Sequence, residues 1–164
     1  RLPFMSDTEK RHLLEQVQDV GKAYDLILLD APAGLDETVL TLCTLADATA
    51  LITTPDPSAV TDAYAVLKLL WTRHGYGSCG LVVNQAGGLY EGKRTAEKLQ
   101  QAARQFLGQE WPVWGVIEAD RQFAAAVKNQ QLATVVYPNA KALEQIGDML
   151  PKLLGAVQKS DKAA

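Results

Sequence analysis

The chain has 164 residues, of which 48% are hydrophobic and 21% are charged, and its formal net charge is −3 at pH 7. This length and composition are typical of a single globular domain that can bury a sizeable core. The mildly acidic balance argues against direct nucleic-acid binding, which needs clustered Lys and Arg. No run approaches the roughly 18 apolar residues of a membrane span, and no signal peptide is visible.

The two cysteines, Cys43 and Cys79, lie far apart in the sequence and lack the spacing of a metal site. We therefore predict that both are reduced residues in or near the core, which is typical of a cytoplasmic protein. No basic stripe accompanies Trp71, Trp111 and Trp114, so we expect these tryptophans to pack in the core or between helices.

Helical and strand patterns alternate in the first half of the chain. The predicted elements, in chain order, are a helix that opens with a capping box at Ser6–Glu9 and continues to Val20, a strand at Leu26–Leu29, a helix after Gly34, a strand at Ala50–Thr53 and a helix from Asp56 to about Gly75. Asp56 followed by Pro57 is a typical helix start, since the side chain caps the helix and proline suits its first position.

The alternation continues in the second half. The predicted elements are a strand at Leu81–Val83, a loop over residues 85–92, a helix over residues 99–106, a strand at Val113–Ile117, a helix capped by Asp120, a β-like piece at Thr134–Val136 and a last helix from Asn139. We expect Pro151 to kink or end this last helix, and we expect residues 159–164 to form a disordered tail.

Strands separated by helical crossovers predict an α/β fold, with a parallel sheet that carries helices on both faces. The sequence shows no internal repeat or linker, so we assign residues 1–158 to one three-layer domain. In such a sheet the carboxyl ends of all strands meet at the same edge, where open α/β folds bind their ligands. Polar residues that directly follow strands are therefore the candidates for function.

The strongest candidate is Asp30, which ends the strand-length apolar run Leu26–Leu29 and is followed by Pro32 and Gly34. A carboxylate in that place suits a Mg²⁺ ion or a water, and a glycine lets a backbone N–H approach a phosphate. Asn84 either ends its strand or uses its amide, which both donates and accepts, to read a purine edge. For Asp56 and Asp120, helix capping is the favoured interpretation.

One glycine-rich segment, Gly87–Arg94, matches the phosphate-loop pattern up to its Gly92-Lys93 pair. The pattern then needs Ser or Thr as a Mg²⁺ ligand, but the next residue is Arg94. Glu91 also places a negative charge where backbone amides would face phosphate. We therefore predict that this segment is not a phosphate loop.

The segment from Tyr24 to Gly34 resembles the second conserved element of the MinD/ParA-type deviant phosphate-loop ATPases. Residues 53–64 are similar to the next element, and Val82-Val83-Asn84 is similar to the adenine-reading strand end. Residues 91–108, together with residues 115–120, Val127 and Tyr137-Pro138, narrow the resemblance to the branch that regulates flagellar number and placement, known as FlhG or FleN. The similarity covers roughly residues 6–155.

This resemblance implies a Rossmann-like phosphate-loop NTPase fold that binds ATP and Mg²⁺ and acts as an ATP-driven homodimerisation switch. It implies that Asp30 lies near the Mg²⁺ and the attacking water, and that Pro32 and Gly34 sense the γ-phosphate. Asn84 and the turn formed by Ile117, Glu118 and Ala119 would hold the adenine. The implied partners are a signal-recognition-type GTPase, flagellar switch components or a flagellar transcription activator.

The family's glycine-rich loop and its neighbouring strand, which precede the Asp30 element, have no counterpart in residues 1–29. We therefore expect the chain to be the C-terminal portion of such an ATPase and to be unable to hydrolyse ATP alone. The family's membrane-binding C-terminal helix also has no counterpart, because no basic amphipathic extension follows Gln158. The alternatives are an interaction module without ATPase activity, or a cell-division, plasmid-partition or cellulose-synthesis relative.

Overall fold

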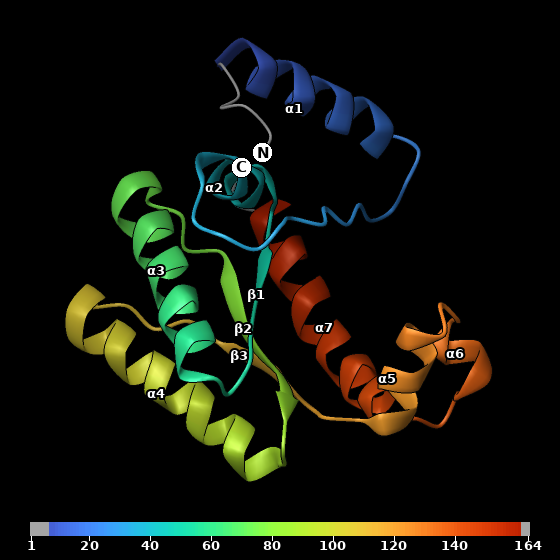
Figure 1. The fold of residues 1–164 in the computed structure, drawn as a ribbon. Coiled ribbons are helices and arrows are strands. Elements are labelled where there is room, and N and C mark those ends of the chain that lie inside the picture. Colours follow the sequence, from blue (N-terminus) through green and yellow to red (C-terminus); the bar gives the residue numbers. More distant parts are fainter. Residues whose placement is uncertain (1–6, 162–164) are drawn as a thin grey trace.

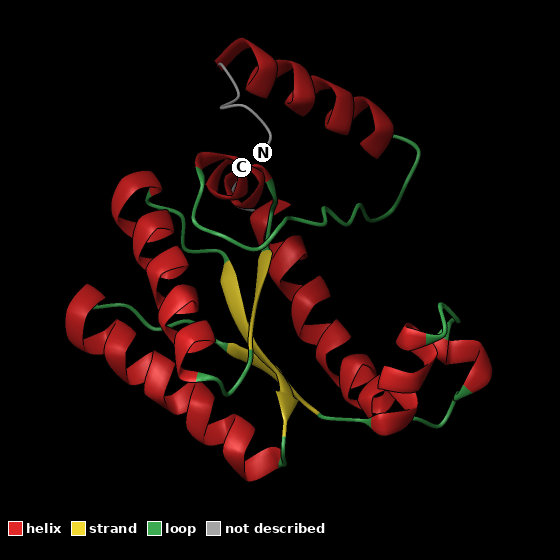
Figure 2. Cartoon of the chain, in the orientation of Figure 1, coloured by secondary structure: helices red, strands yellow, loops and turns green. Residues whose placement is uncertain are grey.

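The structure is a computed structural model that describes residues 7–161 (Figures 1 and 2). Its elements, in chain order, are α1 (Asp7–Gly21), α2 (Glu37–Leu45), β1 (Thr49–Thr53), α3 (Pro57–His74), β2 (Cys79–Ala86), α4 (Leu89–Leu107), β3 (Val113–Glu118), α5 (Arg121–Lys128), α6 (Ala133–Val136) and α7 (Lys141–Asp161).

The three strands of the described chain form a parallel sheet in the order β1-β2-β3. Thr49 of β1 is paired with Cys79 of β2, and the register continues to Thr53 and Val83. β2 lies in the centre, with a strand on either side and helices on both faces, so its first five residues, Cys79–Val83, are all buried and contain no polar side chain apart from the thiol. Successive helical connections return each new strand parallel to the last, which matches the predicted topology.

Helices cover both faces of the sheet, so the fold has three layers, as predicted. Leu81 of β2 packs in one apolar cluster with Leu67 of α3 and Leu99 of α4. The next residue, Val82, packs in a second cluster with Met149 of α7. Neighbouring residues of a strand point to opposite faces, so a single strand contributes to both cores. Figure 1 shows α3 and α4 on one side of the strands and α7 on the other.

Two glycines let the layers approach closely. A Cβ at Gly80 of β2 would lie 1.9 Å from the indole of Trp114 on β3. A Cβ at Gly92 of α4 would lie 2.2 Å from Cγ1 of Val116. In both places a side chain of β3 fills the space that a Cβ on the glycine would need, because interiors are packed too densely to leave a spare methyl volume.

The helix boundaries follow local rules that the sequence reveals. Asp56 caps α3 by accepting hydrogen bonds from the backbone N–H groups of Ser58 at 2.8 Å and Ala59 at 3.4 Å. Gly75 ends α3 with a left-handed φ of 62°, a conformation that glycine adopts without the usual penalty. Asp120 caps α5 in the same way as Asp56 caps α3.

The predicted strand at Leu26–Leu29 is wrong. These residues form no regular structure, and Leu28 is 78% exposed. An apolar run becomes a buried strand only where another strand takes its backbone hydrogen bonds and layers cover its faces. The segment instead leads into α2, whose Glu37 lies 3.8 Å from Arg73 in the last turn of α3. Residues 26–29 thus have no strand partner within the described chain and lie outside the sheet.

Two predictions near the C-terminus also need correction. Residues 134–136 belong to the short helix α6, not to a β-like piece, because the N–H groups of Val136 and Tyr137 bond to carbonyls four residues earlier. Pro151 lies inside α7 and does not end it. Residues 159–161 continue that helix instead of forming a tail, and residues 162–164 lie outside the described part of the chain.

The predicted core residues are confirmed. Cys43 and Cys79 are buried and free, and Trp111 and Trp114 are 2% and 4% exposed. The rings of Trp71 and Trp111 meet edge to face, with centroids 6.3 Å apart, which is a favoured aromatic geometry. Across residues 7–161 we find no helix with the length and apolar content needed to cross a membrane.

Candidate functional site

The carboxyl ends of β1, β2 and β3 lie at one edge of the sheet, where α3, α4 and α5 begin (Figure 1). Two of the turns there are joined directly, since the backbone N–H of Ala119 donates to the carbonyl of Ala86 at 2.8 Å. The sheet register continues to this point, with Ala86 opposite Glu118. The structure therefore brings the predicted Asn84 turn and the predicted Ile117–Ala119 turn side by side.

Asn84 is half-buried on β2, and a strained residue follows it. Its Oδ1 accepts the backbone N–H of Gln85 at 2.9 Å, and Gln85 has a positive φ of 56°. Non-glycine residues in the left-handed region are uncommon and concentrate at functional sites. Among the described residues the Asn84 Nδ2 group has no hydrogen-bond partner, so two N–H donors and one oxygen lone pair remain for a ligand.

Two residues of the predicted turn, Ile117 and Glu118, are the last residues of β3; the first is buried and the second is anchored. Ile117 packs in the core beside α7. The Glu118 carboxylate is held by Lys141 Nζ at 2.7 Å and by Gln145 Nε2 at 2.9 Å. The same Gln145 accepts the Glu118 backbone N–H at 2.8 Å. The Glu118 side chain is thus directed to α7, and Ala119, the residue that follows β3, is exposed.

These contacts lower the pKa of Glu118, with the hydrogen bond from Lys141 as the largest cause and that from Gln145 as the next. Sequence reasoning missed both partners. Lys141 and Gln145 are four residues apart, the spacing that places two side chains on the same helix face, but that spacing gives no sign of which strand the face meets.

Asp120 joins two helices at the same edge. Its Oδ1 accepts from Gln122 and Phe123 at the start of α5, and its Oδ2 accepts the Ala142 N–H at the start of α7 at 3.1 Å. These hydrogen bonds, first among them that from Ala142, lower the pKa of Asp120. Its role is structural, which agrees with the capping interpretation.

The structure does not bring Asp30, Pro32 and Gly34 to this edge. They lie in the exposed segment between α1 and α2, which Figure 1 shows at the end of the molecule opposite the starts of α3 and α4. Gly34 has a positive φ of 136° with open space around its Cα. No group of three or more His, Cys, Asp or Glu residues that would hold a metal occurs within the described residues.

The glycine-rich segment Gly87–Arg94 is not arranged to hold a phosphate. The Gly87 N–H donates to the Glu91 carboxylate at 2.6 Å, so a side-chain anion occupies the place where phosphate would bind. Helix α4 already begins at Leu89, and the Gly92 N–H bonds to the Gly88 carbonyl. The N–H groups of Gly87 and Gly92 are therefore already bonded within the segment.

No protein-family model matches the chain. It is 28% identical over 138 residues to the antiactivator FleN of Pseudomonas aeruginosa, covering 84% of this chain and 49% of FleN. It is 28% identical over 153 residues to the flagellum site-determining protein YlxH of Helicobacter pylori, covering 91% of this chain and 51% of YlxH. The chain thus spans about half the length of these relatives.

Solved structures share the fold. The MinD cell division protein of Aquifex aeolicus superposes with a TM-score of 0.70 at 21% identity, covering 94% of this chain and 63% of that protein. The septum site-determining protein MinD of Pyrococcus horikoshii, solved with Mg-ADP, superposes with a TM-score of 0.67 at 22% identity, covering 88% and 56%. These likenesses support the Rossmann-like α/β architecture.

Proposed function

We propose that this chain, a relative of the MinD/ParA-type ATPases and of their FleN and FlhG flagellar branch, forms the base-binding side of an ATP-dependent switch. The observation that carries the proposal is the hydrogen bond from Ala119 to Ala86, which holds the Asn84 turn against the turn after β3. Open α/β sheets bind ligands at this edge.

The chemistry of this edge suits a purine. The free Nδ2 group of Asn84 donates and its Oδ1 still has a lone pair, so this amide matches a base edge that both accepts and donates. The Ala119 backbone directly follows the neighbouring strand β3, where it would line the second side of the base. Glu118 supports that backbone through Lys141 and Gln145 and is not itself a ligand in this proposal.

The described residues contain no group of three or more side chains that could hold Mg²⁺, and Asp30 lies away from Asn84. The proposal therefore assigns Asp30, Pro32 and Gly34 to Mg²⁺ and the γ-phosphate only in an assembly where their segment joins the sheet. The outer edge of β1 is the place for such a strand. It has no neighbour in the described chain, and Ile52 on β1 is 59% exposed.

In this proposal residues 1–158 are the C-terminal portion of the ATPase domain, and the phosphate loop belongs to a segment that precedes it. We further propose homodimerisation, a cytoplasmic location and a role in flagellar number or placement. These rest on relatives named as a flagellar antiactivator and a flagellum site-determining protein. A flagellar GTPase, switch component or transcription activator is the proposed partner.

Nucleotide binding at the Asn84 edge is testable by an NMR titration of the purified chain with Mg-ADP. The expected result is shifts of the Asn84, Gln85 and Ala119 amides that are lost in Asn84→Ala. The matched control is Asn129→Ala, an exposed asparagine at the end of α5 that should leave the shifts unchanged. Unchanged spectra at millimolar Mg-ADP, or equal shifts in the Asn84 variant, would refute the proposal.

The chain alone should not turn over ATP, because no group within residues 7–161 is arranged to clamp the β- and γ-phosphates. Mg²⁺-dependent turnover that Asp30→Ala abolishes would contradict this expectation. The alternative function is an interaction module without ATPase activity. One observation favours this alternative: in the glycine-rich segment Gly87–Arg94, the Gly87 N–H is bonded to the Glu91 side chain and is not available for a phosphate. A titration that shows no nucleotide binding, together with partner binding, would support this alternative.

A further inference from the structure

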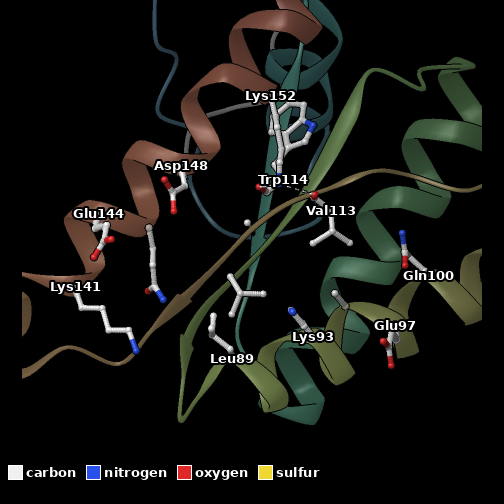
Figure 3. A pocket seen from close by; sticks show the side chains of 14 residues that line it. Leu89, Lys93, Glu97, Gln100, Val113, Trp114, Lys141, Glu144, Asp148 and Lys152 are labelled. Carbon is white, nitrogen blue, oxygen red and sulfur yellow. Dashed lines mark hydrogen bonds between the residues drawn. The ribbon is translucent and has the colours of Figure 1, made fainter.

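A cavity of about 600 Å³ lies at the outer edge of β3, away from the Asn84 turn. Figure 3 shows it as a groove with β3 as its floor, α4 as one wall and α7 as the other. Four consecutive β3 residues, Val113–Val116, line it together with side chains of both helices. The proposed function uses two residues of its lining, Lys141 and Gln145, as supports of Glu118, and assigns no ligand to the groove itself.

The backbone groups that face the groove follow from the alternation of a strand. Ala119 directs its N–H to β2, so residues 116 and 118 direct their N–H and C=O groups outward. A register shift between Val113 and Gly115 interrupts the alternation before Trp114, and there only the carbonyl is assigned to the outer edge. Two observations agree with this assignment. Lys152 Nζ donates to the Trp114 carbonyl at 2.7 Å, and Gln145 Oε1 accepts the Glu118 N–H at 2.8 Å.

Lys152 and Gln145 therefore take the place of a neighbouring strand at two positions of the edge. An ammonium replaces a strand's N–H at Trp114, and an amide oxygen replaces a strand's C=O at Glu118. Between them, the N–H and C=O of Val116 have no partner among the described residues. Backbone groups of this kind are costly to bury unpaired, and an edge that offers them is a template for another strand.

The walls of the groove carry an excess of unpaired negative charge. Glu144 and Asp148 on α7 and Glu97 on α4 line it, and none of the three has an ion-pair partner within residues 7–161. Of the lysines around it, Lys141 is paired with Glu118 and Lys152 is bound to carbonyls. Lys93 and Lys152 are the lining lysines without a carboxylate partner among the described residues, so the three unpaired carboxylates exceed them by one charge, and the walls favour a positively charged ligand.

We propose that this groove binds an extended, basic segment of a partner polypeptide as a fourth strand beside β3. The residue opposite Val116 would donate to its C=O and accept from its N–H. Alternate residues of a strand lie about 6.8 Å apart on one face. Glu144 and Asp148 are one helical turn apart, about 5–6 Å between their Cβ atoms, so they match basic residues at two alternate positions.

The occupant is a single strand and not a second folded sheet. The edge is recessed between α4 and α7 (Figure 3), and another sheet would bring its own helices into these walls. Strand addition of this kind takes its affinity from main-chain hydrogen bonds and its specificity from alternate side chains. The inference does not depend on nucleotide binding, so it stands or fails separately from the proposed function.

The probe is the fluorescein-labelled peptide Thr-Lys-Val-Lys-Val-Lys-Thr with blocked ends, whose binding to the purified protein is followed by fluorescence anisotropy. It should bind, and the same peptide with Glu in place of each Lys should not. Two further peptides carry N-methyl groups on alternate amides, one along each edge of the strand. One of these two should lose binding, since a strand presents only one edge to β3.

The protein variant Asp148→Lys should weaken peptide binding about tenfold, because attraction in a partly enclosed groove becomes repulsion. The matched control, Asp62→Lys, changes an exposed α3 carboxylate far from the groove and should have no effect. Binding should also slow amide exchange at Val116. Equal affinity for Asp148→Lys and the unchanged protein, or for both N-methylated peptides, would overturn the proposal.

Exchange in the free protein provides a separate check. If the Val116 amide were already as protected as that of Val82 in the central strand, another part of this chain, such as residues 133–136, would cover the edge. A peptide-independent dimer that protects Val116 would identify a second copy as the occupant. Either result would overturn the assignment to a partner segment.

Discussion

Replacing Gly92 with alanine tests the close approach of α4 to β3. The added Cβ would lie 2.2 Å from Val116 Cγ1, whereas ordinary contacts there measure 3.4–4 Å. Val116 lies on the sheet and Gly92 is buried, so the helix must move outward or the valine must leave its rotamer. Ala86, at 3.2 Å, restricts the movement further. We expect a loss of stability.

The size of the loss is the difference of two effects. Overpacking a dense core costs about 1–3 kcal/mol, and the severity of this overlap favours the upper value. Alanine in place of glycine within a helix returns about 1 kcal/mol. The expected net loss is therefore about 2 kcal/mol, and for a domain of this size that lowers Tm by roughly 4–8 °C.

The matched control is Gly147→Ala, in α7, where an added Cβ meets no atom within 4 Å. This substitution has the higher helix propensity of alanine but adds no steric overlap, so it should raise the free energy of unfolding by about 1 kcal/mol. Urea unfolding followed by circular dichroism measures both. A double variant with Val116→Ala should recover at least about 1 kcal/mol relative to the sum of the single changes. Equal stability of the two glycine variants would refute the packing argument.

Three further results are expected. Gly80→Ala should destabilise more than Gly92→Ala in the same unfolding assay, because its Cβ would lie 1.9 Å from the Trp114 indole. The overlap should displace this indole, so unchanged Trp fluorescence of the folded variant would contradict the prediction. Native Cys43 and Cys79 should not react with a thiol reagent at pH 8, since burial raises the pKa of both and that of Cys79 to about 12; two thiols should react after unfolding. The lowered pKa values of Glu118 and Asp120 mean that their stabilisation is complete above the ordinary values of 4.5 and 3.8 and is lost as pH falls through the folded-state values. Glu118→Gln should therefore lower Tm at pH 7 and flatten its decline below pH 4.5, and an unchanged slope would argue against the contribution of Glu118.

Local chemistry made part of this fold predictable. Asp56 and Asp120 cap helices because a side-chain oxygen reaches N–H groups only two or three residues away, and Gly75 ends α3 for an equally local reason. Asn84 was a candidate because it lies at the end of an apolar strand. The partners that anchor this edge, Lys141 and Gln145, come from a helix more than twenty residues away, and no local pattern identifies them.

The apolar runs Leu26–Leu29 and Leu81–Val83 have the same strand-like pattern, yet only the second lies in the sheet. The sequence by itself determined the α/β alternation, the capping residues, the apolar core positions and the family resemblance, because these depend on periodicity and on short-range contacts. Only the tertiary structure decided which apolar run has neighbours for its backbone groups. It also decided that Asp30 lies apart from Asn84, and that Val116 faces an open groove. These outcomes depend on which strands and helices meet in space, and residue order does not specify that.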